Sequence, residues 1–204
     1  MRAGVNNQNE FYRGLEAAGR AMAPWAGEAT AATAAAVHAA VAALPTAQPA
    51  TVVACAVGCA HCCHFPVGIT WPEGRALAEA LQHDAARQRA LLAAADATAT
   101  ATWQQLVGMP CPLLVDGRCT AYAARPLPCR SLTSADARAC ERALAGLAVP
   151  VPRDEAAFWR GLGASHALAA DSGLGTRELR SAVAALLRTP DDPRSAFAAA
   201  RPAG

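Results

Sequence analysis

The sequence contains no lysine: its 18 basic residues are all Arg, and 16 acidic residues leave a formal net charge of +2. These arginines are scattered along the chain and form no cluster. A nucleic-acid-binding surface usually needs a concentrated basic patch. We therefore expect no nucleic-acid partner.

Long apolar segments are also missing. Residues 1–14 are polar and carry no apolar core of a secretory signal. The Ala-rich run 29–44 is too short and too weakly apolar to span a bilayer, and it contains His38. We expect a cytoplasmic protein with no membrane partner. In a reducing compartment, clustered thiols favour metal or redox chemistry over structural disulfides.

Strand signals and internal repeats are absent as well. Apolar residues at helical spacing, bounded by Pro and Gly, predict helices over 11–23, 24–44, 70–92, 154–170 and 176–187. Shorter helices are expected over 103–107, after Ser131 with Cys140 on it, and around Phe197. The predicted fold class is all-α: a small helical domain with an irregular, metal-organised cysteine-rich loop region.

The chain divides by composition into three parts. We predict N-terminal helices in 1–50, a cysteine-cluster core in 51–149, and C-terminal helices in 150–204 that pack on this core. Thr70 and Glu73 have the spacing of a helix capping box. Glu178 and Arg180 are expected to face outward from their helix, and residues 1–9 to be frayed.

All eight cysteines lie between positions 55 and 140, and the flanks have none. The first segment reads C-A-V-G-C-A-H-C-C-H and the second, 111–130, reads C-P-L-L-V-D-G-R-C-T-A-Y-A-A-R-P-L-P-C-R. The second segment has no helical or strand period, yet it is too apolar for a disordered linker. It is most easily ordered by something that its thiols bind.

Thiolates are soft ligands that suit Zn²⁺, Cu(I) and iron–sulfur clusters. Four are enough for one Zn²⁺ or one [4Fe–4S] cluster, so eight can hold one centre with spectators or two centres. Cys62 and Cys63 are adjacent and cannot easily bind the same ion, so one of them turns to another centre or stays a thiol. Buried free thiols and disulfides are the alternatives. The candidate metal ligands are Cys55, Cys59, Cys62, Cys63, Cys111, Cys119, Cys129 and Cys140.

Several side chains beside the thiols have two interpretations each. His61 and His64 are either nitrogen ligands or partners for a sulfur or a turn. Arg125 and Arg130 either neutralise excess thiolate charge or form surface ion pairs. Tyr122 is interpreted as a packing residue and not as a catalytic acid.

The second segment resembles the CxxCxxCC, or YkgJ-type, cysteine-cluster family, which is described as zinc- or iron-chelating. The family pattern C-x-x-Y-x-x-R-P-x-x-C-R is matched by Cys119, Tyr122, Arg125, Pro126, Cys129 and Arg130. The first segment departs from the family name, because three residues separate Cys55 from Cys59 where the name has two. A related branch includes flagellin lysine N-methylases, described as carrying an iron–sulfur cluster, but no methyl-donor site is recognisable here.

Three functions compete. The first is a cysteine-ligated metal-binding protein, with an iron–sulfur cluster preferred over zinc, that supports redox or protein-modification chemistry. Its expected ligands are Cys59, Cys62, Cys111, Cys119 and Cys129; the other three cysteines form a second set or act as redox thiols. The second is a non-enzymatic module in which structural zinc presents a surface to a protein or peptide partner. The third, a radical S-adenosylmethionine enzyme, needs a barrel whose strands are missing.

Overall fold

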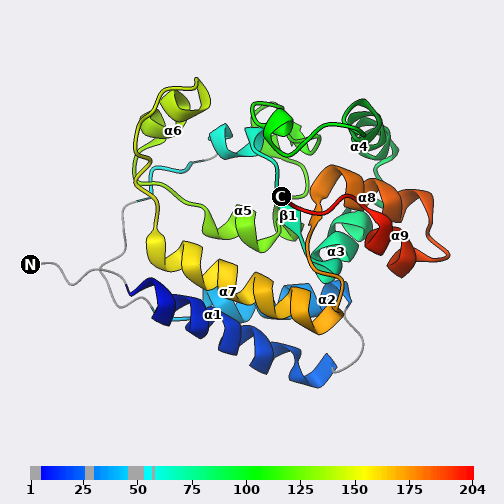
Figure 1. The fold of residues 1–204 in the computed structure, drawn as a ribbon, viewed down its shortest axis with the longest axis horizontal. Helices are drawn as coiled ribbons and strands as arrows, with labels where there is room; N and C mark the ends of the chain where they lie inside the picture. Colours follow the sequence, from blue (N-terminus) through cyan, green and yellow to red (C-terminus); the bar gives the residue numbers. More distant parts are fainter. Residues whose placement is uncertain (1–5, 26–29, 46–52, 57) are drawn as a thin grey trace, which may run out of the picture.

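A computed structural model of the chain describes residues 6–25, 30–45, 53–56 and 58–204 (Figure 1). This described part is mostly helical, which confirms the all-α fold class. The helices are α1 Asn7–Met22, α2 Ala31–Ala42, α3 Trp71–Leu81, α4 Ala85–Ala97, α5 Leu127–Ser131, α6 Ala137–Leu144, α7 Glu155–Ser172, α8 Leu179–Arg188 and α9 Pro193–Ala199. Across these described ranges, none of the helices has both the length and the apolar character needed to cross a membrane.

Short elements connect the helices. The 3₁₀ turns are η1 Ala23–Trp25, η2 His61–His64, η3 Gln104–Leu106 and η4 Tyr122–Ala124. Two antiparallel pairs of very short strands are present: β1 Gly68–Ile69 with β4 Arg177–Glu178, and β2 Leu114–Val115 with β3 Arg118–Cys119. The prediction that the chain has no strands was therefore wrong in detail, although no larger sheet forms among the described residues.

The first layer of the fold is the pair of α1 and α7, which lie side by side and run in the same direction in Figure 1. Glycines let the two backbones approach closely: a Cβ on Gly14 would lie 2.0 Å from the carbonyl oxygen of Arg160, and one on Gly163 would lie 2.0 Å from that of Phe11. Glu10 of α1 forms a buried ion pair with Arg160 of α7. α2 covers α1 and reaches α3.

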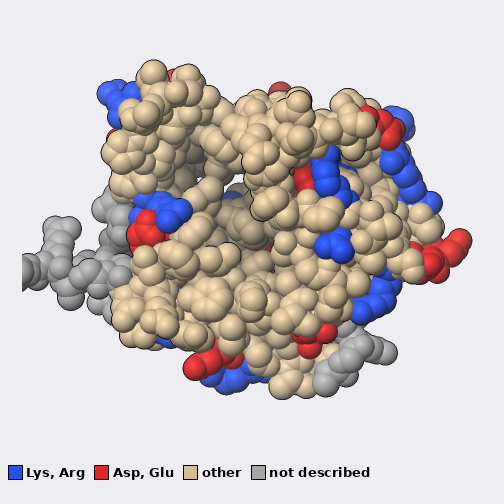
Figure 2. Space-filling view, viewed as in Figure 1, with Lys and Arg blue, Asp and Glu red and all other residues tan. Residues whose placement is uncertain are grey.

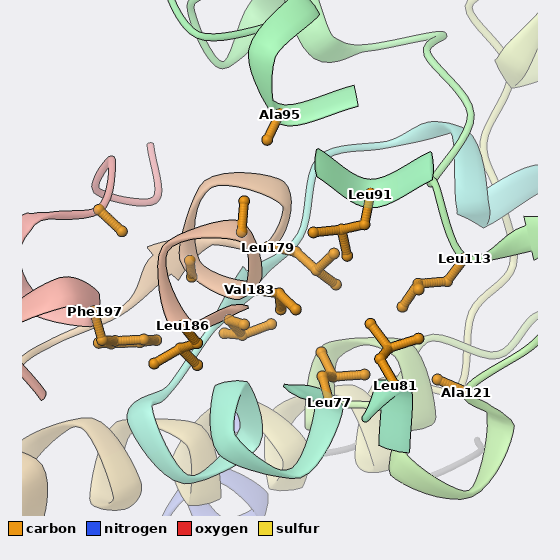
Figure 3. Close-up of a cluster of buried hydrophobic side chains, with 14 of the residues drawn as sticks. Leu77, Leu81, Leu91, Ala95, Leu113, Ala121, Leu179, Val183, Leu186 and Phe197 are labelled. Carbon is orange, nitrogen blue, oxygen red and sulfur yellow. The ribbon is translucent and has the colours of Figure 1, made fainter. Parts of the chain in front are cut away.

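The second layer is built from α3, α4, α8 and α9 around an apolar core (Figure 3). Leu77 and Leu81 of α3 face Leu91 of α4 and Val183 of α8 there. Leu113 and Ala121 enter the same core from the second cysteine segment, and both are buried. The cysteine-rich segment is thus packed against the helices and is not a detached loop.

Four predicted helix boundaries need correction. α1 already begins at Asn7, because the side chain of Asn6 accepts a hydrogen bond from the amide of Asn9 and caps the helix. The predicted helix 70–92 is broken after Leu81, and α4 starts behind its own cap, Asp84. Residues 103–107 form only the 3₁₀ turn η3. The capping box of Thr70 and Glu73 is confirmed.

The predicted helix 24–44 is also shorter. Trp25 ends the turn η1, residues 26–29 lie outside the described residues, and α2 starts behind Thr30. The division into 1–50, 51–149 and 150–204 stays a prediction. On the face in Figure 2, charged side chains stand in small separate groups on a mostly uncharged surface, as their scatter along the sequence predicts.

Candidate metal centre

Backbone hydrogen bonds join the two cysteine segments. The amide of Cys111 donates to the carbonyl oxygen of Cys63 at 2.7 Å, and the amide of Gly108 donates to that of His64, also at 2.7 Å. The end of the first segment and the start of the second therefore run side by side. This places Cys63 beside Cys111, although 48 positions separate them in the sequence.

A tight hairpin positions Cys119 in the same region as Cys63 and Cys111. β2 and β3 are connected by Asp116 and Gly117, which have φ angles of 48° and 71°. Such positive angles are typical of a two-residue hairpin turn, in which Asp-Gly is a favoured pair. In this register Cys119 pairs with Leu114. The Asp-Gly dipeptide was the sequence signal that could have predicted this hairpin.

Cys129 lies on the short helix α5, which a buried carboxylate holds in place. Oε1 of Glu73 accepts a hydrogen bond of 2.6 Å from the amide of Leu127, in the first turn of α5. Oε2 of Glu73 accepts the hydrogen bonds of the capping box from Thr70 at 2.9 and 2.8 Å. His38 Nε2 lies 3.4 Å from Oε1. Sequence reasoning found the capping box but not this link to the cysteine segment.

Four thiols meet in this region, and we call them the inner thiols: Cys63, Cys111, Cys119 and Cys129. Burial strongly raises the pKa of Cys129, and the neighbouring thiols of Cys111, Cys62 and Cys119 add to the increase. A hydrogen bond donated by the Cys62 thiol lowers the pKa of Cys63, against burial and the influence of the other inner thiols. The inner thiols thus lie close enough to perturb one another.

Three of the remaining thiols form a second neighbourhood. We call Cys55, Cys59 and Cys140 the outer thiols. Burial raises the pKa of Cys59, and the thiols of Cys55, Cys62 and Cys140 raise it further. The structure therefore separates the eight cysteines into two neighbourhoods. Cys62 is the thiol that borders both, since it influences Cys59 as well as Cys129.

Backbone amides point at several sulfurs. Burial raises the pKa of Cys111 and of Cys119, but the amides of Leu113 and Ala121 oppose it by hydrogen bonding to the two sulfurs. The amide of His61 does the same for Cys59. A hydrogen bond to the charged form stabilises a thiolate. These amides would stabilise the thiolates of a metal-bound state, whereas burial keeps the free thiols neutral.

Arg125 supplies positive charge between the two segments. Its guanidinium lies 3.7 Å from the centre of the Tyr122 ring. The hydrogen bond with Cys63 and burial raise the pKa of Cys62, and burial raises that of Cys119; the charge of Arg125 opposes both increases. The Nε atom of Arg125 is buried and has no hydrogen-bond partner. Tyr122 was predicted to be a packing residue, but its side chain is 63% exposed and serves mainly as a platform for Arg125.

Arg130 holds the backbone near the inner thiols in place. Arg130 donates to the carbonyl oxygens of Arg125 and Ala123 and so fixes the turn between η4 and α5. Within the described ranges neither Arg125 nor Arg130 forms an ion pair, so their interpretation as surface ion pairs was wrong. The spacing of Arg125 and Arg130 in the motif is explained by the hydrogen bond that the Arg130 side chain donates to the carbonyl oxygen of Arg125.

Arg180 of α8 was missed by sequence reasoning. It is 3% exposed, pairs with the fully buried Glu178 at 3.1 Å, and donates to the carbonyl oxygens of Met109 and Pro110 at 3.1 and 3.0 Å. The expectation that both residues face outward was wrong. Glu178 also binds Arg201, and this buried ion network holds the start of the second cysteine segment against α8.

The histidines beside the cysteine segments contribute less directly to the candidate site. Nδ1 of His64 lies 3.1 Å from the carbonyl oxygen of Ala60, as expected for a side chain that caps a turn. In the described ranges no three Cys, His, Asp or Glu side chains already converge closely enough to hold a metal ion. The donor set nevertheless fits a soft metal, because its members are thiols with amide hydrogen bonds and an unpaired buried Arg nitrogen beside them.

A comparison with known families bears on this donor set. Residues 54–145 match the model of the CxxCxxCC family, described as a "Putative zinc- or iron-chelating domain". This part of the chain is similar to the CxxCxxCC domain. No curated protein and no solved structure matches the chain.

The matched region includes all eight cysteines, which confirms the resemblance and supports a metal-binding role in general terms. It ends at residue 145, just after α6, so α7, α8 and α9 lie outside it. Glu178 and Arg180 thus support the domain from a part of the chain beyond its boundary. All eight cysteines are free thiols in the structure, and their individual roles as ligands stay a prediction.

Proposed function

We propose that the protein is an iron–sulfur protein in which Cys63, Cys111, Cys119 and Cys129 hold one [4Fe–4S] cluster. Four thiolates are the usual ligand set of such a cluster, which supplies one-electron transfer when bound. The ligand set differs in two respects from the sequence-based one. Cys63 replaces Cys62, because Cys63 lies beside Cys111. Cys59 moves to the other neighbourhood.

The observation that carries this proposal is the unpaired Nε of Arg125 beside the inner thiols. Leaving a buried donor unsatisfied costs about 1–3 kcal/mol. An anionic metal–thiolate centre would accept this hydrogen bond and stabilise the buried charge. The charge of Arg180 likewise opposes the increase in the pKa of Cys111 that burial causes.

Two features favour a cluster over a single zinc ion. The inner thiols are neighbours but do not converge on one point, which suits the wider span of a cluster better than one small ion. They are also half-buried under apolar residues of the core, and burial with N–H···S hydrogen bonds is how proteins tune cluster potentials. We infer that the centre supports redox or protein-modification chemistry.

The ligand assignment is tested by substituting single cysteines. Cys119→Ser and Cys129→Ser should each lower bound iron and acid-labile sulfide after anaerobic reconstitution, and lower the melting temperature, since metal binding and folding are coupled. Cys55→Ser is the matched control and should keep both contents. Unchanged iron and sulfide in both inner variants would remove these residues from the ligand set.

A non-enzymatic interaction module with structural zinc is the second candidate. Exposed apolar side chains surround the second cysteine segment: Val107, Met109 and Tyr122 are 49%, 40% and 63% exposed. Such a surface would suit a protein or peptide partner. Stoichiometric zinc in a colourless protein, without iron, would favour this function. In either case we infer a cytoplasmic protein that binds neither nucleic acid nor membrane.

A further inference from the structure

One side of α7 carries an uncharged stripe that is open to solvent. The other side of this helix packs against α1 and α5. Leu162, in the middle of the stripe, is 43% exposed. Between Glu155 and Asp171 the only charged residue of α7 is Arg160, and it is buried in the ion pair with Glu10. Helical spacing places six residues on the stripe: Phe158, Trp159, Leu162, His166, Ala169 and Ala170.

α1 widens this stripe into a surface that spans two helices. The ring of Phe11 lies 5.9 Å from that of His166, and Tyr12, which is 51% exposed, packs edge-on against Phe11. Leu15 follows one turn after Phe11 and is half-buried. In Figure 2 the surface over the middle of α7 and the adjoining side of α1 is uncharged. We call this surface the α1–α7 face.

The α1–α7 face is large enough for a specific protein interface. α7 has 18 residues and α1 has 16, so the two helices are about 27 and 24 Å long. The axes of packed helices lie about 8–10 Å apart, which gives a surface two helices wide an area of about 500 Å². Two such faces together would bury about 1,000 Å², the lower limit for a specific interface.

The stripe on α7 is complementary to itself in shape. Its bulky residues lie in the N-terminal half and its small residues in the C-terminal half. A two-fold axis at position 164 would place Phe158 of one copy opposite Ala170 of the other, and Trp159 opposite Ala169. Leu162 would lie opposite His166. Each bulky side chain would therefore face a small one, as an interface made of the same surface on both copies requires.

Helix direction also favours a second copy. α1 and α7 run in the same direction, so their macrodipoles do not oppose each other within one chain. A copy related by this two-fold axis would present both helices in the opposite direction and bring positive helix ends beside negative ones. A lipid surface or an unrelated protein would not require bulky and small side chains to be placed symmetrically about position 164.

We propose that the α1–α7 face binds a second copy of this chain and forms a two-fold symmetric dimer in which the two α7 helices run antiparallel. Both helices lie outside the matched region 54–145. The dimer therefore does not depend on which metal the cysteines hold, and bound iron or zinc should be the same in dimeric and monomeric variants.

Sedimentation equilibrium of the anaerobically purified protein measures this association. At about 100 μM the wild type should approach twice the chain mass of 20.8 kDa. Leu162→Glu should raise the dissociation constant by about a hundredfold or more, because both copies would bury a carboxylate. Leu147→Glu is the matched control: Leu147 is a 55% exposed residue outside the α1–α7 face, and its replacement should change the constant by less than about threefold.

A pair of substitutions tests the antiparallel register. Ala170→Trp should weaken the dimer by about tenfold or more, since the new ring would overlap Phe158 of the partner. Adding Phe158→Ala in the same chain makes room for that ring and should restore the association. The two positions lie about 18 Å apart along α7, so one change cannot compensate for the other within a single copy. Circular dichroism shows that each variant is folded.

A wild type that stays monomeric at about 100 μM would overturn the dimer. Monomers that bind phosphatidylcholine vesicles, with binding lost in Leu162→Glu, would instead assign the face to lipid. A dimer that Leu162→Glu leaves intact would exclude this face as the interface. Failure of the double variant to regain association would exclude the antiparallel register.

Discussion

The carboxylate of Glu73 accepts the amide hydrogen of Leu127 at 2.6 Å and so ties the start of α3 to the helix that carries Cys129. The same side chain closes the capping box of α3 through Thr70. It is fully buried, with His38 as its other neighbour. One residue thus sets the position of α5 relative to the core of the second layer.

Glu73→Gln should destabilise the protein by about 1–3 kcal/mol. The amide group keeps the shape of the side chain, but its NH₂ would face either Leu127 or Thr70, both of which already donate. Urea unfolding would measure this loss, provided that the wild type and the variant have the same m-value. Glu79→Gln, an exposed change on the same helix, serves as the control and should alter stability by less than about 0.5 kcal/mol.

Two glycines on α1 should change the stability in opposite directions when each is replaced by Ala. Gly14→Ala places a methyl group 2.0 Å from the carbonyl oxygen of Arg160 and should cost about 1–3 kcal/mol. Gly19 is exposed and has no neighbouring atom within 4 Å of a built Cβ, so Gly19→Ala should stabilise the helix by up to about 1 kcal/mol. Thermal unfolding of both variants checks the sign. Equal melting temperatures would contradict the close crossing of α1 and α7.

Arg180 should matter for its geometry and not only for its charge. Lys cannot reproduce the bonds of its guanidinium to Met109 and Pro110, so Arg180→Lys should cost about 1–3 kcal/mol and speed the loss of iron to a chelator. Arg188→Lys on the same helix affects only an exposed ion pair with Asp96 and should do neither. Equal rates of iron loss in the two variants would exclude a role for Arg180.

The metal-free protein should lose stability at alkaline pH. Burial raises the pKa of Cys59, Cys111, Cys119 and Cys129 above the usual 9.0, so these thiols favour the folded state only while they are protonated. Their contribution is fully present below pH 9 and is lost as pH rises through the higher folded values. Because the chain lacks Lys and has only two Tyr, few other side chains titrate there.

Melting temperatures between pH 7 and pH 10, with and without metal, would measure this effect. We expect a steeper fall in the metal-free protein, since bound thiols no longer titrate. A metal-free protein whose melting temperature rises over that interval would show that the thiols are not buried as neutral groups.

Local signals in the sequence predicted much of this fold. Asp154 and Asp192 cap helices close to where they were expected, and Gly173, with a φ of 68°, ends α7. The break before α4 was missed although Asp is a common N-cap residue and Asp84 caps this helix. The hairpin was missed although the Asp116-Gly117 pair is typical of a two-residue hairpin turn. These two errors came from unused local information.

The other differences arise from contacts between distant residues. Arg180 looks like a surface residue in its own helix, and only Glu178 together with the carbonyl groups before Cys111 makes its burial favourable. Likewise, no spacing rule assigns Cys63 to the inner thiols and Cys140 to the outer ones. That partition depends on the packing of α6 on η2 and on the pairing of Cys63 with Cys111.

The most direct test of the central claim is elemental and spectroscopic analysis of the wild-type protein, purified anaerobically without added metal. The purified protein should be brown and contain about four iron atoms and about four acid-labile sulfides per chain. Cys129→Ser should remove the colour, whereas Cys140→Ser should keep it. A colourless protein that contains zinc alone, or no metal, would contradict an iron–sulfur centre at Cys63, Cys111, Cys119 and Cys129.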